Sequence, residues 1–203
     1  DIIGVCWGTT IYNMALNLKH KALKGVQIVQ LKGGISHSQS NTYAYEVVEL
    51  FSEAFSTVGR YLPLPVMFDT VQIKELIEKD KHIKKILDLG RQANIAVFTV
   101  GTVKNDALLF RLGYIDKKDR DIIQNRAVGD ICSRFFDAQG NICDKELDER
   151  TVGIKLEELK AKEKRILVAG SQRKITAIKA ALKGEFANIL VTDQYTAEEL
   201  LKD

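Results

Sequence analysis

Small, hydroxyl and basic residues follow short apolar runs at four points of the chain, and these residue types suit the binding of an anion. The four turns are Trp7-Gly8-Thr9-Thr10, Lys32-Gly33-Gly34, Gly101-Thr102 and Gly170-Ser171-Gln172-Arg173-Lys174. In an open, mostly parallel α/β sheet, such turns meet at the carboxyl ends of the strands, where ligands bind. Where a turn runs into a helix, free backbone N–H groups favour an anion. The pattern predicts a site for a small phosphorylated molecule.

The first of these turns could hold the phosphate. Gly8 lets the backbone approach closely, and the hydroxyl and N–H groups of Thr9 and Thr10 can donate to phosphate oxygens. Thr9 or Thr10 could instead be an ordinary N-cap of the helix that the spacing of the following apolar residues predicts. The turn by itself leaves both interpretations open.

The last turn is the stronger candidate, because a glycine, a hydroxyl and two cations follow a strand in immediate succession. A cation near a helix N-terminus opposes the macrodipole by about 0.3–1 kcal/mol, so a nearby anion would explain the placement. Lys174 is favoured over Arg173 because we expect it in the first helical turn. The alternative is that both side chains point to water.

Lys32 ends the apolar run 26–31 and precedes two glycines, so its amine could be partly desolvated at the edge of the sheet. Desolvation favours the neutral amine, which can attack an aldehyde to form a Schiff base. The alternative is a solvated lysine at a strand end. The covalent hypothesis requires that Thr9, Thr10 and Lys174 face the same crevice.

The acidic and histidine residues give weaker signals. Asp130 and Asp69 stand at or just beyond apolar runs, where a carboxylate could accept hydrogen bonds from sugar hydroxyls or cap a turn. The three histidines show no metal-ligand spacing, so we expect no metal. Ser36-His37-Ser38 is a poor candidate for nucleophilic catalysis, because sequence neighbours rarely reach the geometry that it needs.

Apolar runs alternate with helical patterns along most of the chain, which predicts an α/β fold with a mostly parallel sheet. We expect strands at residues 2–6, 26–31, 95–100, 127–132, 165–169 and 188–191. We expect helices after Thr10, around 47–55, and at 70–79, 82–92, 106–112, 117–125, 172–182 and 196–201. A hairpin is expected at Gln139-Gly140, and the charged stretch 155–164 should be a solvated helix.

Composition narrows the class of protein. The 203 residues fit one domain, and the net charge of +3 is too small and too dispersed for this segment to bind nucleic acid by itself. Three cysteines without a Cys-x-x-Cys pair favour a reduced, cytoplasmic protein. No apolar stretch approaches the roughly 20 residues of a membrane helix, and no signal peptide is recognised. Because Asp1 leads directly into an apolar run, we expect upstream sequence to be missing.

Several stretches together resemble the effector-binding domain of SorC-type sugar-responsive transcriptional regulators. The matching stretches, in chain order, are 4–10, 31–34, 62–65, 127–131, 134–137, 168–174, 177–182 and 191–197. The resemblance implies a Rossmann-like, three-layer domain over residues 1–203, related to sugar-phosphate isomerases and deaminases. It also implies a homo-oligomer, and an operator-binding helix-turn-helix domain that this chain lacks.

The resemblance also assigns roles to particular positions. It places phosphate contacts on Thr9, Thr10 and Lys174. Sugar-side contacts would come from the turn of Lys32 and Gly33, from Asn41 and from Asp130, and Gly8 and Gly101 would complete the site. Within the family, the likeness is greatest to regulators of deoxyribonucleoside use, which implies deoxyribose 5-phosphate as effector. The imine on Lys32 is a hypothesis that comes from the residues themselves and not from the resemblance.

Two other classes of function were weighed against this one. An isomerase or deaminase on the same scaffold needs a positioned acid and base near the sugar carbonyl, and the strand ends show no acidic pair or His–acid pair with suitable spacing. A nucleotide or cofactor module is disfavoured because Gly-x-Gly-x-x-Gly and Walker motifs are absent from the sequence. We therefore expect a repressor domain without a cofactor.

Overall fold

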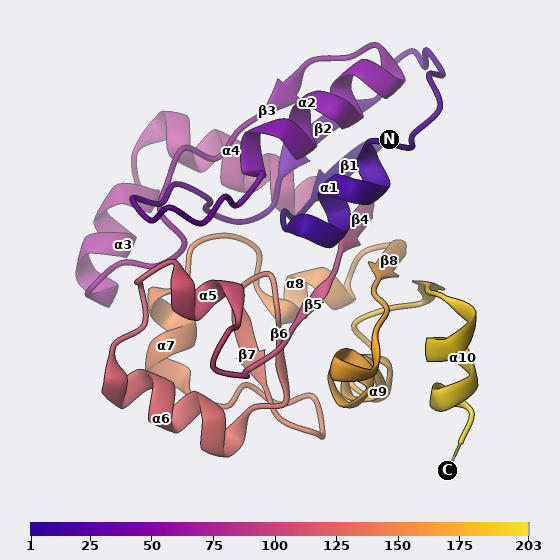
Figure 1. The fold of residues 1–203 in the computed structure, drawn as a ribbon. Coiled ribbons are helices and arrows are strands. Elements are labelled where there is room, and N and C mark those ends of the chain that lie inside the picture. The colour runs from indigo at the N-terminus through magenta and orange to yellow at the C-terminus, as the bar shows by residue number, and fades with distance from the viewer. Residues whose placement is uncertain (203) are drawn as a thin grey trace.

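The computed structural model describes residues 1–202, which fold around a six-stranded sheet with the order β3-β2-β1-β4-β8-β9 (Figure 1). Its strands, all parallel, are β1 (Ile2–Val5), β2 (Gln27–Gln30), β3 (Gly59–Arg60), β4 (Ile95–Phe98), β8 (Lys164–Val168) and β9 (Ile189–Val191). A second, antiparallel sheet contains β5 (Val100–Gly101), β6 (Gly129–Ile131) and β7 (Arg134–Phe136). The predicted α/β class with a mostly parallel sheet is confirmed.

Helices connect the strands. They are α1 (Thr9–Ala15), α2 (Ala44–Phe55), α3 (Val71–Glu78), α4 (Lys81–Gln92), α5 (Leu108–Arg111), α6 (Lys117–Arg126), α7 (Lys145–Arg150), α8 (Leu156–Lys160), the 3-10 turn η1 (Gln172–Lys174), α9 (Ile175–Lys183) and α10 (Gln194–Leu200). Most follow the predicted spacing within a few residues.

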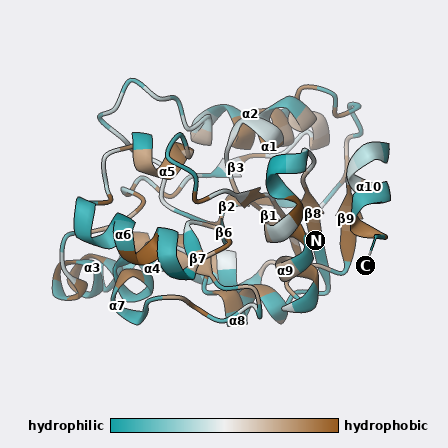
Figure 2. Ribbon diagram, turned by 60° about the horizontal axis from the view of Figure 1, so that its bottom comes forward, coloured by the Kyte–Doolittle hydropathy of each residue, from teal (hydrophilic) through white to brown (hydrophobic). Residues whose placement is uncertain are grey.

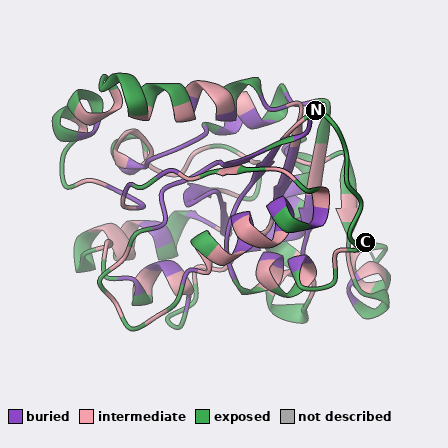
Figure 3. Cartoon of the chain, turned by 90° about the horizontal axis from the view of Figure 1, so that it is seen from above, coloured by how far each residue is buried: buried purple, intermediate pink, exposed green. Residues whose placement is uncertain are grey.

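Helices cover both faces of the main sheet, which gives three layers. In β1, Ile3 and Val5 face the core shared with α1 and α2. On the opposite face, Ala96 and Phe98 of β4 pack in the core that includes buried residues of α8 and α9. Figure 3 shows the buried strands between helices whose outer faces are exposed. Burial on both faces explains why the strands are continuous apolar runs.

The predicted strand 95–100 is divided between the two sheets. β4 ends at Phe98, and from Val100 the chain continues as β5, which pairs with β6 so that Gly101 lies opposite Asp130. Thr99 lies at the junction. This division brings the small sheet to the carboxyl end of the large one, and the two sheets together form the walls of the site described below.

One sequence expectation about turns is wrong and another is confirmed. The N-cap of α1 is Gly8, with φ 137° and no side-chain cap, so neither threonine caps that helix. The expected hairpin at Gln139-Gly140 is present, with an antiparallel bridge between Phe136 and Ile142 and backbone hydrogen bonds from Asp137 to Asn141 and from Cys143 to Phe135. A second hairpin, not expected from the sequence, joins β6 to β7 through Cys132 and Ser133, which have φ values of 52° and 68°. Positive φ at both central residues fits the right-handed twist of a two-residue hairpin, but asparagine and glycine usually supply it.

The charged stretch after residue 155 is only partly the solvated helix that we expected. Lys162 is buried and donates from Nζ to the carbonyls of Gly90 and Arg91, at the carboxyl end of α4.

Figure 2 shows hydrophilic residues along α6 and hydrophobic ones on β8 and β9. Within residues 1–202, no helix combines the length and the apolar character needed to cross a membrane.

Candidate functional site

A cavity of about 320 Å³ opens where β1, β4, β8 and the small sheet meet. Seven of the nine sequence-predicted residues line it: Gly8, Thr9, Thr10, Lys32, Gly101, Asp130 and Lys174. They are far apart in the sequence: Thr10 and Lys174, for example, are separated by 164 positions. The parallel strands bring them together, because all their carboxyl ends lie at one edge of the sheet.

Lys174 occupies one wall of the cavity. Its Nζ lies 3.4 Å from Oγ1 of Thr10 and 3.5 Å from Oγ1 of Thr99, so one ammonium and two hydroxyls converge. Burial lowers the pKa of Lys174, and the negative charge of Asp130 partly opposes that shift. Without an anion, the half-buried ammonium is incompletely compensated, and this favours a negatively charged ligand.

Arg173 does not share this environment. It is exposed, and its guanidinium pairs with Asp106 at 2.5 Å, which lowers the pKa of that carboxyl. Both residues border the cavity. The preference for Lys174 over Arg173 at the candidate anion site therefore agrees with the geometry.

Lys32 lies on another wall and is only 5% exposed. Its Nζ donates to Oγ of Ser133 at 3.2 Å and lies 3.6 Å from the centroid of the Trp7 ring. The indole is itself fixed, because Nε1 of Trp7 donates to the carbonyl of Gly33 at 2.8 Å. The amine is thus held at the cavity surface rather than in solvent, which removes the alternative of a solvated strand-end lysine.

Asp130 is 6% exposed, and its Oδ2 accepts a hydrogen bond from the backbone N–H of Ser133 at 3.1 Å. Burial raises the pKa of Asp130, while the positive charges of Lys32 and Lys174 and the Ser133 N–H act in the opposite direction. The carboxylate packs against Gly101, where a Cβ atom would lie 1.9 Å from Oδ1. A larger residue at position 101 would displace the Asp130 carboxylate.

Three further side chains belong to the site and were not selected from the sequence. Ser133 bridges Lys32 and Asp130, Thr99 contacts Lys174, and Trp7 covers the amine of Lys32. Trp7 stands in the first predicted turn, so its position was a usable signal. Thr99 was hidden inside a predicted strand, and Cys132-Ser133 is not a typical hairpin sequence.

Gly33 and Asn41 do not line this cavity. Gly33 lies against the backbone of Pro65, where a Cβ atom would be 1.9 Å from the carbonyl oxygen, and it serves packing. Asn41 borders a separate hollow next to α2. Its Oδ1 accepts from the N–H of Tyr43 at 2.8 Å, a local turn contact before that helix.

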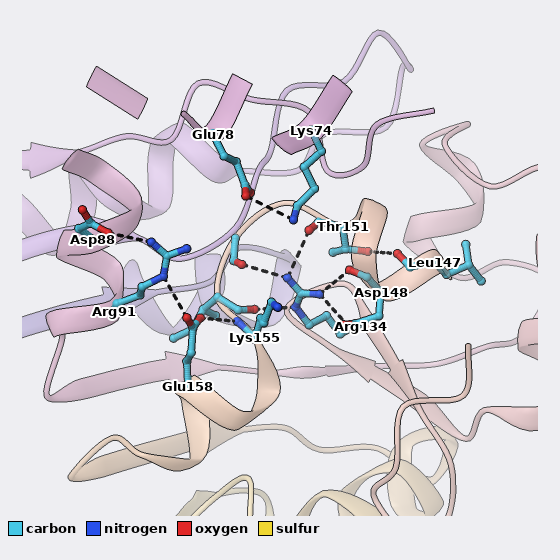
Figure 4. A network of polar contacts seen from close by, with 12 residues as sticks. Lys74, Glu78, Asp88, Arg91, Arg134, Leu147, Asp148, Thr151, Lys155 and Glu158 are labelled. Carbon is cyan, nitrogen blue, oxygen red and sulfur yellow. Dashed lines mark hydrogen bonds and ion pairs between the residues drawn. The ribbon is translucent and has the colours of Figure 1, made fainter. Parts of the chain in front are cut away.

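A buried arginine supports the segment behind Lys32 (Figure 4). Arg134 donates to the backbone carbonyls of residues 148, 151, 153 and 154 and pairs with the carboxylate of Asp148 at 2.7 Å. Gly153, in turn, forms an antiparallel bridge with Lys32. The guanidinium therefore holds in place the loop against which the Lys32 backbone rests.

The cavity combines an anion-binding end with a lysine at a distinct wall. Hydroxyls and an ammonium suit a phosphate, whereas a buried amine beside a carboxylate suits a carbonyl carbon. Among residues 1–202, no three His, Cys, Asp or Glu side chains are grouped so that they could hold a metal ion.

Comparison with known proteins identifies the family. The profile of the Sugar-bind family, a sugar-binding domain, matches residues 1–202. The chain belongs to this family. The sugar-binding domain is 56% identical over 203 residues to the "Deoxyribonucleoside regulator" of Bacillus subtilis, and 29% identical over 205 residues to the "Sorbitol operon regulator" of Klebsiella pneumoniae. Each alignment covers 100% of this chain. The chain spans 65%, less than two thirds, of the length of each of these two relatives.

Solved structures agree with this assignment. A DeoR family transcriptional regulator from Listeria monocytogenes superposes with a TM-score of 0.89 at 27% identity, covering 98% of the sugar-binding domain and 79% of that chain. The full-length sorbitol operon regulator SorC from Klebsiella pneumoniae superposes with a TM-score of 0.87 at 26% identity. The superposition covers 100% of the sugar-binding domain and 66% of the SorC chain. These relatives are named as regulators rather than enzymes, so the resemblance to SorC-type regulators is confirmed.

Proposed function

We propose that this sugar-binding domain is the effector sensor of a bacterial transcriptional repressor and that it binds a phosphorylated deoxy sugar, deoxyribose 5-phosphate. The observation that carries the proposal is the convergence of Lys174, Thr10 and Thr99 at one end of a cavity whose other wall holds the amine of Lys32. The name of the Bacillus relative supports a deoxyribose-containing effector.

In this arrangement the phosphate lies among the ammonium of Lys174 and the residues Gly8, Thr9 and Thr10. The open-chain aldehyde then reaches Lys32, which forms a reversible Schiff base with C1. A deoxy sugar lacks the 2-hydroxyl and offers fewer hydrogen bonds, so a covalent bond would supply affinity that polar contacts cannot. Asp130 and Gly101 complete the sugar side of the site.

The phosphate assignment is tested by replacing Lys174 with alanine and measuring the affinity for deoxyribose 5-phosphate and for deoxyribose. We expect the phosphorylated sugar to lose about 10-fold or more, as the loss of a charge-assisted hydrogen bond worth about 1.5–3 kcal/mol implies. The unphosphorylated sugar should be affected little. Lys183→Ala, at the exposed end of α9, is the matched control. Equal losses for both sugars would remove Lys174 from the phosphate site.

The covalent assignment has its own test. Borohydride reduction in the presence of deoxyribose 5-phosphate should leave a stable adduct on Lys32, detected by peptide mass spectrometry. Lys32→Arg keeps the charge and should abolish the adduct. An unmodified wild-type protein at saturating sugar would show that Lys32 acts only as a hydrogen-bond donor.

For the longer protein, we propose that effector binding shifts a cytoplasmic homo-oligomer between operator-bound and free forms through a DNA-binding domain outside this chain. Such a shift requires different effector affinities in the two forms. The measurement is operator affinity of the full-length protein with and without deoxyribose 5-phosphate. No change at saturating effector would contradict the regulatory role. A sugar-phosphate isomerase or deaminase is the alternative, and turnover of the sugar would favour it.

A further inference from the structure

Lys32 and Asp130 are both buried beside the candidate phosphate site and are linked through Ser133 rather than by a direct ion pair. Both are at least 94% buried, both line the cavity, and Ser133 contacts each of them, the amine through its hydroxyl and the carboxylate through its backbone N–H. The sequence suggested no acid or base placed near a sugar carbonyl. The folded chain supplies one, because the hairpin at Ser133 turns Asp130 toward the strand end that carries Lys32.

An imine cannot form at a lysine that keeps its proton. The amine must lose one proton before it attacks the aldehyde, and the hydroxyl of the resulting carbinolamine must gain one before it leaves as water. In an exposed site, solvent and buffer carry these protons. Trp7 and Ser133 cover the amine of Lys32, so a group within the cavity is needed.

We propose that Asp130 is this proton carrier for imine formation at Lys32. Its carboxylate takes a proton from the Lys32 ammonium through a water molecule in the cavity, and the neutral amine then forms the N–C1 bond. Attack leaves a protonated nitrogen and an alkoxide on C1, and a proton passes from that nitrogen to the alkoxide to give the carbinolamine hydroxyl. The protonated Asp130 returns its proton to this hydroxyl, the C–O bond breaks, and water leaves. Ammonium and aldehyde are thereby converted to protonated imine and water, and Asp130 ends as a carboxylate. This role rests on the proposed covalent binding and adds a catalytic residue to it.

The other titratable groups around the pair are poor substitutes. The thiol of Cys6, which also lines the cavity, has a pKa raised well above its ordinary value by burial and by the neighbouring Cys132, so it stays protonated. The amine of Lys174 is oriented toward the hydroxyls of Thr10 and Thr99. Asp106 is exposed and paired with Arg173. Burial raises the pKa of Asp130 and so makes it a better proton acceptor than a carboxylate in water.

The test is the rate at which the Lys32 adduct forms. Protein and deoxyribose 5-phosphate are mixed, quenched with borohydride at intervals, and analysed by mass spectrometry. Asp130→Asn should slow adduct formation by about 100-fold or more, as expected for the loss of a general acid–base. Asp106→Asn, the other cavity carboxylate, should leave the rate unchanged.

Binding of the corresponding alditol phosphate, which has a phosphate but no aldehyde, separates this role from a structural one. Asp130→Asn should change the affinity for the alditol phosphate far less than it slows adduct formation, because the phosphate contacts of Lys174 are kept and a nearby negative charge is removed. A wild-type rate in Asp130→Asn would overturn the proton-carrier role alone. A wild-type protein that binds the alditol phosphate and forms no adduct would instead overturn the covalent binding on which it rests.

If Asp130→Asn fails to bind the alditol phosphate, the proton-carrier role of Asp130 is tested by the pH dependence of adduct formation at Lys32 in the wild-type protein. The carboxylate accepts a proton only when ionised, so the rate should fall as pH falls through the pKa of Asp130. Because that pKa is raised, the decrease should begin above the ordinary aspartate range near pH 4. A rate that stays constant down to that range would overturn the proposal.

Discussion

At the scale of single residues, the unliganded site has a positive charge, the ammonium of Lys174, that no negatively charged group of residues 1–202 contacts directly. Lys174 is half-buried, its Nζ contacts two neutral hydroxyls, and burial lowers its pKa. A base whose folded-state pKa is lowered destabilises the fold at every pH below that pKa, and the penalty disappears above the pKa of the unfolded chain. The charge of Lys174 therefore favours the binding of an anion and lowers the stability of the protein when no anion is bound.

Replacing Lys174 with methionine should make the unliganded protein more stable, because the aliphatic stem remains and the charge is lost. At pH 7 we expect the Tm to rise by about 2–4 °C, which corresponds to about 1 kcal/mol for a chain of this size. The gain should shrink as pH rises toward the ordinary lysine value of 10.5. Thermal melts at pH 7 and pH 10 measure both effects. A gain of equal size at both pH values would argue against the charge as its cause.

At the scale of elements, the site depends on a hairpin and a loop rather than on the large sheet alone. The β6–β7 hairpin positions Asp130 and Ser133, and Arg134 at its outgoing strand binds the loop that supports Lys32. If the guanidinium of Arg134 were removed, the buried carbonyls that it binds would be left without hydrogen bonds. Such unpaired buried groups lower the stability of the fold. Arg134 thus couples the stability of this region to the geometry of the site.

Arg134→Met should destabilise the protein by about 3–5 kcal/mol, because it removes one partner of a buried ion pair and leaves several carbonyls unpaired. Arg91→Met is the matched control within the same view (Figure 4). Arg91 is 43% exposed and pairs with Asp88 and Glu158, and exposed pairs contribute about 0–1 kcal/mol. Urea unfolding measures both variants. Similar losses for the two would refute a special role for Arg134.

The elements also show how far the sequence could predict this site. Strand-end turns predicted that Thr10, Lys32 and Lys174 meet, because parallel strands share one carboxyl edge, and the structure agrees. Ser133 could not be predicted, because its turn depends on positive φ at two residues whose types do not favour it. Asn41 was assigned by resemblance, and the length of the 35–43 loop allows it to lie elsewhere.

At the scale of the whole molecule, the site joins the first turn of the chain to one near its end. A ligand that binds only the folded domain stabilises all of it, by about 2.7 kcal/mol at 100 times its dissociation constant. We expect deoxyribose 5-phosphate at that concentration to raise the Tm by roughly 5–11 °C. Thermal melts against ligand concentration measure the effect, with ribose 5-phosphate and inorganic phosphate as comparisons. An unchanged Tm would contradict binding of this sugar.

The contact between Lys174 and Thr10 has a further consequence for the lifetime of the protein in a cell. Because the two residues are 164 positions apart, a single cut by a protease in any intervening loop leaves the two halves of the phosphate site on separate pieces of chain. Proteases act mainly on transiently opened chains, and a bound effector makes such openings rarer. Molecules that hold the sugar should therefore outlive empty ones. If the protein has the proposed regulatory function, the effector would then set the amount of protein present as well as its state.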